Sequence, residues 1–134
     1  MTTTRVAAAA AGLFGVLGLF QAALALGVPW GRAAWGGSAA ELPTGLRIAS
    51  GVAVLLFALA VVTVLRAGGH PVWTPLSDTW ARRVVWFFAV YCVLGTVANA
   101  ISRSAVERAV WTPVCLVLAV LTFIVARSAR PRVT

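Results

Sequence analysis

Residue types that build metal and redox sites are scarce in this sequence. The chain of 134 residues has one histidine, two cysteines and three acidic residues, and all eleven of its basic residues are arginine. A haem with two histidine ligands or a zinc site built from several histidines is therefore not expected. Cys92 and Cys115 lack CxxC spacing and polar neighbours, so we interpret them as small core residues. We predict neither a metal nor a cofactor.

Charge is scarce as well, and apolar residues dominate. Hydrophobic residues make up 61% of the chain, charged residues 10%, and the mean hydropathy is +0.96. Soluble domains are about half apolar and about a quarter charged. This composition is typical of a protein dissolved in lipid, and the length leaves room for one domain over residues 1–134. Although the net charge is +8, the arginines lie at the ends of apolar segments, so we expect no nucleic acid partner. Arginine without lysine, with abundant alanine and glycine, indicates a bacterial origin.

Four apolar segments are long enough to cross a membrane, which takes about 20 residues. They lie at about residues 6–27, 46–65, 84–101 and 105–126, and none has an ionised side chain at its centre. We predict an all-α fold, an antiparallel four-helix transmembrane bundle packed through small residues. The first segment could also be a signal peptide, since Arg5 precedes it and residues 23–25 resemble a cleavage site. Its length favours a span.

Arginine positions predict the orientation in a plasma (inner) membrane. The N-terminus, the second loop and the C-terminal tail together hold more arginines than the first and third loops, and arginine is enriched on the cytoplasmic side. Both termini are therefore predicted to be cytoplasmic. The two groups are Arg5, Arg66, Arg82, Arg83, Arg127, Arg130 and Arg132, against Arg32, Arg47, Arg103 and Arg108.

Tryptophans near the segment ends are predicted to anchor the helices at headgroup depth. These are Trp30, Trp35, Trp73 and Trp80. The sequence VWTP occurs at residues 72–75 and again at 110–113. In the first copy Thr74 fits a helix N-cap and Pro75 the first helical position.

The second copy falls inside the fourth segment. Ser104 and Glu107 have capping-box spacing and predict an earlier helix start, so Pro113 is expected to kink the helix, with Thr112 bonding the freed backbone. In the second loop, Asp78 is predicted to pair with Arg82 four residues later.

The polar residues of the spans gather in the outer half of the predicted membrane. One hypothesis is an outward-facing pocket whose arginines hold a phosphate or carboxylate headgroup and whose walls hold an acyl or isoprenoid tail. The alternative, which the sequence favours, is that these groups are interhelical hydrogen bonds worth about 0.6 kcal/mol each and anchors of helix ends. The candidate residues are Asn99, Arg103, Glu107, Arg108, Gln21 and Arg47.

Three stretches, GVPWGRAAWGG at 27–37, LPTGLRIASG at 42–51 and NAISRSAVERAVWTP at 99–113, resemble those of small uncharacterised four-span membrane proteins of bacteria, actinobacteria among them. The resemblance implies topology and no activity.

The spans contain no pair of acid and base, so no catalytic residue is expected and we predict a protein that is not an enzyme. It would bind membrane lipids, a partner membrane protein or further copies of itself. The alternative is a subunit of a small oligomeric transporter or channel, although the absence of intramembrane ionisable residues weighs against proton coupling.

Overall fold

Four long helices make up most of the computed structural model, which describes residues 2–128. They are α1 (Thr3–Ala25), α2 (Thr44–Ala67), α3 (Asp78–Ala100) and α4 (Thr112–Ser128), and a π-helical turn, η3 (Glu107–Trp111), leads into α4. Two short 3₁₀ turns, η1 (Gly31–Ala33) and η2 (Trp35–Gly37), lie in the first loop. Arg130 and Arg132, two of the arginines that predict the orientation, lie outside the described residues.

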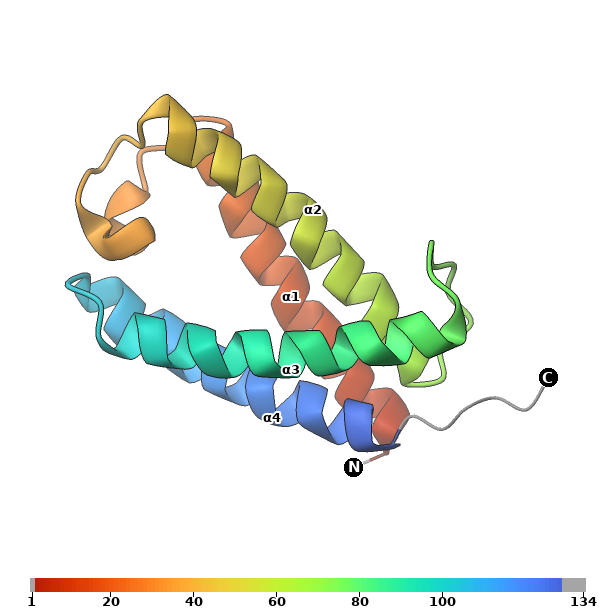
Figure 1. Ribbon diagram of the computed structural model, residues 1–134. Coiled ribbons are helices and arrows are strands. Elements are labelled where there is room, and N and C mark those ends of the chain that lie inside the picture. The colour runs from red at the N-terminus through yellow and green to blue at the C-terminus, as the bar shows by residue number, and fades with distance from the viewer. Residues whose placement is uncertain (1, 129–134) are drawn as a thin grey trace.

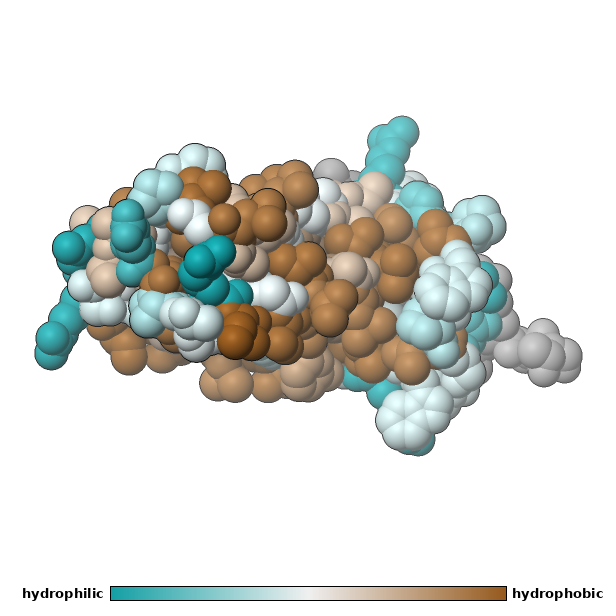
Figure 2. Space-filling view, turned by 90° about the horizontal axis from the view of Figure 1, so that it is seen from above, coloured by the Kyte–Doolittle hydropathy of each residue, from teal (hydrophilic) through white to brown (hydrophobic). Residues whose placement is uncertain are grey.

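All four helices, with η3 counted into the last, are long and apolar enough to cross a membrane. The predicted all-α fold with four membrane-spanning helices is therefore confirmed, and the chain is a multi-pass membrane protein. A band of hydrophobic residues covers the middle of the molecule, between two ends at which hydrophilic residues gather (Figure 2). Large apolar side chains on the helices, such as Leu19, Leu55 and Leu94, are exposed, as expected where the solvent is lipid.

The helices form two antiparallel pairs, α1 with α2 and α3 with α4, and the pairs cross each other (Figure 1). They converge at the end that carries the N-terminus and residues 68–77, which we call the closed end. They diverge at the end that carries the first loop, residues 26–43, which we call the open end. The first loop folds down between the pairs at the open end (Figure 1).

Burial follows this geometry. The buried positions of α1 and α3 lie mainly in their first halves, and those of α2 and α4 mainly in their second halves, which are the halves nearest the closed end. They include Phe14, Val64, Phe88, Leu118 and Val125. Tight packing is thus concentrated at the closed end, where the small residues Ala7, Ala10 and Ala11 of α1 are buried.

A cluster of aromatic rings lies where the two pairs cross. Phe14 contacts Phe57 and Phe88 at ring-centroid distances of 6.2 and 5.5 Å, and Tyr91 lies 6.3 Å from Phe57. Gly18 of α1 lies against Phe57, and a Cβ added there would make an ordinary van der Waals contact with the Phe57 Cβ at 3.6 Å.

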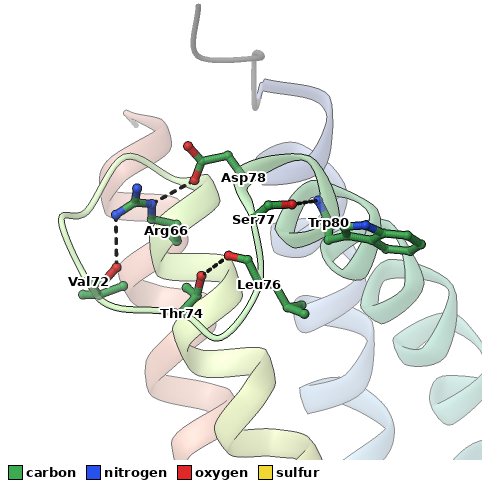
Figure 3. A network of polar contacts seen from close by, with 7 residues as sticks. All are labelled: Arg66, Val72, Thr74, Leu76, Ser77, Asp78 and Trp80. Atoms are coloured by element: carbon green, nitrogen blue, oxygen red, sulfur yellow. Dashed lines mark hydrogen bonds and ion pairs between the residues drawn. The ribbon is translucent and has the colours of Figure 1, made fainter. Parts of the chain in front are cut away.

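The second loop differs from its prediction. Ser77, and not Thr74, caps α3: its hydroxyl accepts the Trp80 amide at 3.4 Å, while the Thr74 hydroxyl donates to the Leu76 carbonyl at 2.6 Å (Figure 3). The prediction for Thr74 was therefore wrong. A serine hydroxyl, which caps a helix start well, was available three residues downstream.

The carboxylate of Asp78 also has a different partner from the predicted Arg82. It accepts from Arg66 Nε at 3.0 Å, so the ion pair joins the end of α2 to the start of α3 (Figure 3). Arg66 also donates to the Val72 carbonyl at 3.3 Å. One arginine at the end of α2 thus organises the loop, which spacing along one helix did not reveal.

The start of the fourth span resolves the conflict created by Pro113. In an α-helix, Pro113 would clash with the carbonyl four residues before it. The sequence predicted a kink, and the structure has the π-helical turn η3 directly before α4. The Glu107 carbonyl accepts both the backbone amide of Thr112, five residues on, and the Thr112 hydroxyl at 3.1 Å. Thr112 therefore bonds the displaced backbone, as its position predicted.

Candidate functional site

A cavity of about 390 Å³ lies at the open end, between the diverging helix pairs and beneath the first loop. Its walls come from α1, α3 and the start of the fourth span, its floor includes Phe57 of α2, and the η1–η2 segment forms its roof. Small-molecule sites commonly have volumes of about 300–1,000 Å³. The polar lining residues include Gln21, Asn99, Ser102 and Glu107, and the aromatic ones are Phe20, Trp35, Phe57, Tyr91 and Trp111.

The roof, residues 31–37, is fastened to the start of the fourth span by three hydrogen bonds. The Ser104 hydroxyl donates to the Arg32 carbonyl at 2.6 Å, and the Trp111 indole donates to the Ala33 carbonyl at 2.9 Å. The Gly36 amide donates to a Glu107 carboxylate oxygen at 3.2 Å. Residues more than 70 positions apart in sequence thus fix the roof over the cavity.

Three consecutive residues of the roof, Trp35, Gly36 and Gly37, have positive φ, a conformation that few residues other than glycine adopt. Gly37 has φ +73°, and a Cβ there would lie 2.8 Å from the Ser104 Cβ, so glycine is required at this contact. Trp35 is the more unusual, with φ +51° in a bulky residue. Its indole donates to the fully buried Ser50 hydroxyl of α2 at 3.0 Å, which ties the roof to the other helix pair. Strained residues of this kind cluster at functional sites.

Glu107 is the one charged residue in the cavity lining, and it is 7% exposed. It accepts from the Gly36 amide and from the Ser102 hydroxyl. Among residues 2–128 the single ion pair is Arg66–Asp78, so no described cation neutralises the carboxylate. The π-helical turn places Glu107 and Trp111 together against the roof and the cavity.

The two intramembrane amides also reach the cavity. Asn99 donates from Nδ2 to the Gly95 carbonyl at 2.7 Å and to Cys115 Sγ at 3.6 Å, so its nitrogen bonds within α3 and across to α4. The Oε1 atom of Gln21 is buried and has no hydrogen-bond partner in the described part of the chain. Asn99 therefore does serve as an interhelical contact, and Gln21 presents an unsatisfied acceptor in the cavity wall.

The structure thus brings together three of the six predicted site residues, Gln21, Asn99 and Glu107, and leaves the three arginines outside the lining. Arg47 donates to the Ala25 carbonyl at 3.2 Å at the end of α1, and Arg108 donates to the Ser102 carbonyl at 2.6 Å. All three, Arg103 included, are exposed. The pocket therefore differs from the one predicted, in which arginines held an anionic headgroup.

The four predicted anchor tryptophans have different surroundings. Trp30, Trp73 and Trp80 are more than half exposed near the ends of the helices, and Arg83 lies 4.9 Å from the Trp80 ring. Trp35 instead bonds to Ser50 and lines the cavity. The sequence did not predict that Trp35 and Trp111 line the cavity. The available signal for Trp35 was the glycine-rich loop around it, and the signal for Trp111 was the proline two residues after it.

Comparisons with protein family models, curated proteins and solved structures find no match for this chain. They therefore add nothing to the resemblance to four-span bacterial proteins, which stays a prediction. Any function has to be inferred from the geometry of the cavity.

Proposed function

We propose that the protein is a non-enzymatic membrane protein that binds one lipid chain or other small amphipathic molecule in the cavity at its open end. The observation that carries this proposal is a cavity of small-molecule size with a mostly apolar lining and a few polar groups at one end. The polar groups come from α1, α3, η3 and the loop before η3, so they can orient one end of a bound molecule.

The mouth of the cavity supports entry from the bilayer. Four lining residues are exposed: Tyr91 and Ala98 on α3, and Trp35 and Gly36 in the roof. A molecule dissolved in lipid can reach the apolar part of the cavity past α3, while its polar end lies beneath the roof. A volume of about 390 Å³ holds part of a diacyl lipid or the whole of a smaller amphiphile.

The arginine distribution supports an orientation in the inner membrane in which both termini and the closed end are cytoplasmic and the cavity lies in the outer half of the bilayer. Single cysteines at Ser77 and Ser38 test this orientation in intact cells with a membrane-impermeant maleimide. Labelling of the cysteine at 38 without labelling at 77 supports it, and the reverse pattern overturns it. The native Cys92 and Cys115 lie within the spans.

Native mass spectrometry of the protein released from lipid nanodiscs tests the binding function. The wild type is expected to retain one defined small molecule, and Ala98→Phe, which places a ring at the mouth, is expected to lose it. Ala100→Phe is the matched control, since Ala100 is also exposed on α3 but does not line the cavity. Equal retention by all three proteins, or a bare higher oligomer that points to conduction, would count against the proposal.

A further inference from the structure

The charge of the cavity lining narrows the chemistry of its ligand. Glu107 is nine-tenths buried and lines the cavity, and its described hydrogen-bond partners, the Gly36 amide and the Ser102 hydroxyl, are neutral. A buried charge normally has a partner of opposite charge. A carboxylate has about four acceptor positions, so two hydrogen bonds leave room for a further donor.

The aromatic residues of the lining favour the same kind of ligand. Phe20 and Trp111 form one pair, with ring centroids 4.8 Å apart, and Trp35, Phe57 and Tyr91 complete the aromatic lining. The faces of such rings attract cations, most strongly where water is excluded. A cation with apolar arms can therefore satisfy both the carboxylate and the rings.

The arginines near the roof do not reverse this preference. Arg32 donates to the Gly37 and Ser38 carbonyls at 3.2 and 3.3 Å, and Arg108 donates to the Ser102 carbonyl. Both are exposed and outside the cavity lining. Exposed charges are screened over about 8 Å at physiological salt, whereas the buried carboxylate is screened much less.

We infer that the cavity binds a lipophilic organic cation, an ammonium or phosphonium group with apolar substituents, whose charge lies between Glu107 and the aromatic rings. This inference rests on the proposed function and names the ligand class of the same cavity. The charge of this ligand is opposite to that of the anionic headgroup in the pocket hypothesis drawn from the sequence, because the arginines lie outside the cavity lining and Glu107 is part of it.

Isothermal titration calorimetry in nanodiscs of zwitterionic lipid tests the inference. The probes are tetraphenylphosphonium and tetraphenylborate, which have nearly the same shape and opposite charges, with protein-free nanodiscs as the blank for partitioning. The wild type is expected to bind the phosphonium at least about tenfold more tightly than the borate. This comparison needs no variant, and equal affinities or a preference for the borate would overturn the inference.

Two variants test whether the Glu107 carboxylate is the charge that makes the protein prefer the phosphonium to the borate. Glu107→Gln keeps the size of the side chain and is expected to weaken phosphonium binding by about tenfold or more, because hydrogen bonds and contacts to a charged group are the strong ones. Glu41→Gln removes the same charge from an exposed loop residue outside the cavity lining and is expected to change the affinity less than about twofold. Similar losses in both variants would overturn the inference.

The failure of this inference and that of the proposed function are distinguishable. If the native occupant that Ala98→Phe loses proves neutral or anionic, the cavity still binds a ligand and only the inference about charge is overturned. If no occupant depends on Ala98, the proposed function fails first.

Discussion

The closed position of the roof requires glycine at residue 37, and replacing Gly37 by alanine should weaken the attachment of the roof to the start of the fourth span. Gly37 has φ +73°, a conformation that costs an L-residue about 1–2 kcal/mol. The added Cβ would also lie 2.8 Å from the Ser104 Cβ, and moving it away breaks the bond from Ser104 to the Arg32 carbonyl, worth about 1 kcal/mol. The total of about 2–3 kcal/mol should raise the open population of the roof about 30- to 150-fold.

Two other glycines separate these contributions. Gly36 has φ +82° but open space around its added Cβ, so Gly36→Ala should incur the conformational cost alone and raise opening about 5- to 30-fold. Gly45 lies in α2 with ordinary φ and open space, so Gly45→Ala should change opening less than about twofold.

Amide hydrogen exchange of peptides covering residues 31–40, measured in nanodiscs, reports the opening of the roof. The amides of Gly31 and Gly37 are protected in the closed roof by the carbonyls of Ala40 and Ala34, both at 2.8 Å. Exchange in Gly37→Ala no faster than in Gly36→Ala would refute the role of the Ser104 contact. If amide exchange is no faster in Gly36→Ala than in Gly45→Ala, the left-handed backbone conformation described for Gly36 in the roof would be refuted.

Two further predictions concern the closed end and the helix crossing, both measured by reversible unfolding in mixed micelles. Phe57→Ala should destabilise the fold by about 3–5 kcal/mol, because this ring is buried where the helix pairs cross. The control Phe87→Ala removes a half-exposed ring and should cost about 1 kcal/mol or less. Equal losses of stability in the two variants would contradict the packing described. A double-mutant cycle on Arg66 and Asp78 should give a coupling of about 0.2–1 kcal/mol, since the pair is partly exposed, and the cycle on Arg82 and Asp78 should give none. Coupling to Arg82 in place of Arg66 would restore the pairing that helix spacing suggested.

The helices were predictable because each span is a local property of the sequence. Twenty apolar residues must form a helix in lipid, where backbone groups can bond only to one another. The clustering of Gln21, Asn99 and Glu107 towards one end of the spans was also predictable, since position along a span fixes depth. Pro113 marked the disturbed turn for the same reason, because its missing amide acts on its own helix.

The cavity was not predictable because it depends on contacts between distant segments. Nothing near Trp35 indicates that its indole bonds to Ser50, or that Gly37 packs on Ser104. The placement of Arg47, Arg103 and Arg108 outside the cavity lining was not predictable either, because a long side chain at a helix end can turn towards backbone carbonyls or solvent and its position in the sequence does not fix which.

The location of the bound molecule tests the central claim most directly. The wild-type protein in nanodiscs would be photolabelled with an alkyl ammonium probe that carries a diazirine, with and without an excess of the unlabelled amine, and the adducts mapped by peptide mass spectrometry. Adducts that the excess removes are expected at lining positions such as Leu17, Gly95 and Ala98. Competed adducts confined instead to lipid-facing positions such as Leu19 and Val93, or adducts that the excess does not remove, would contradict the account.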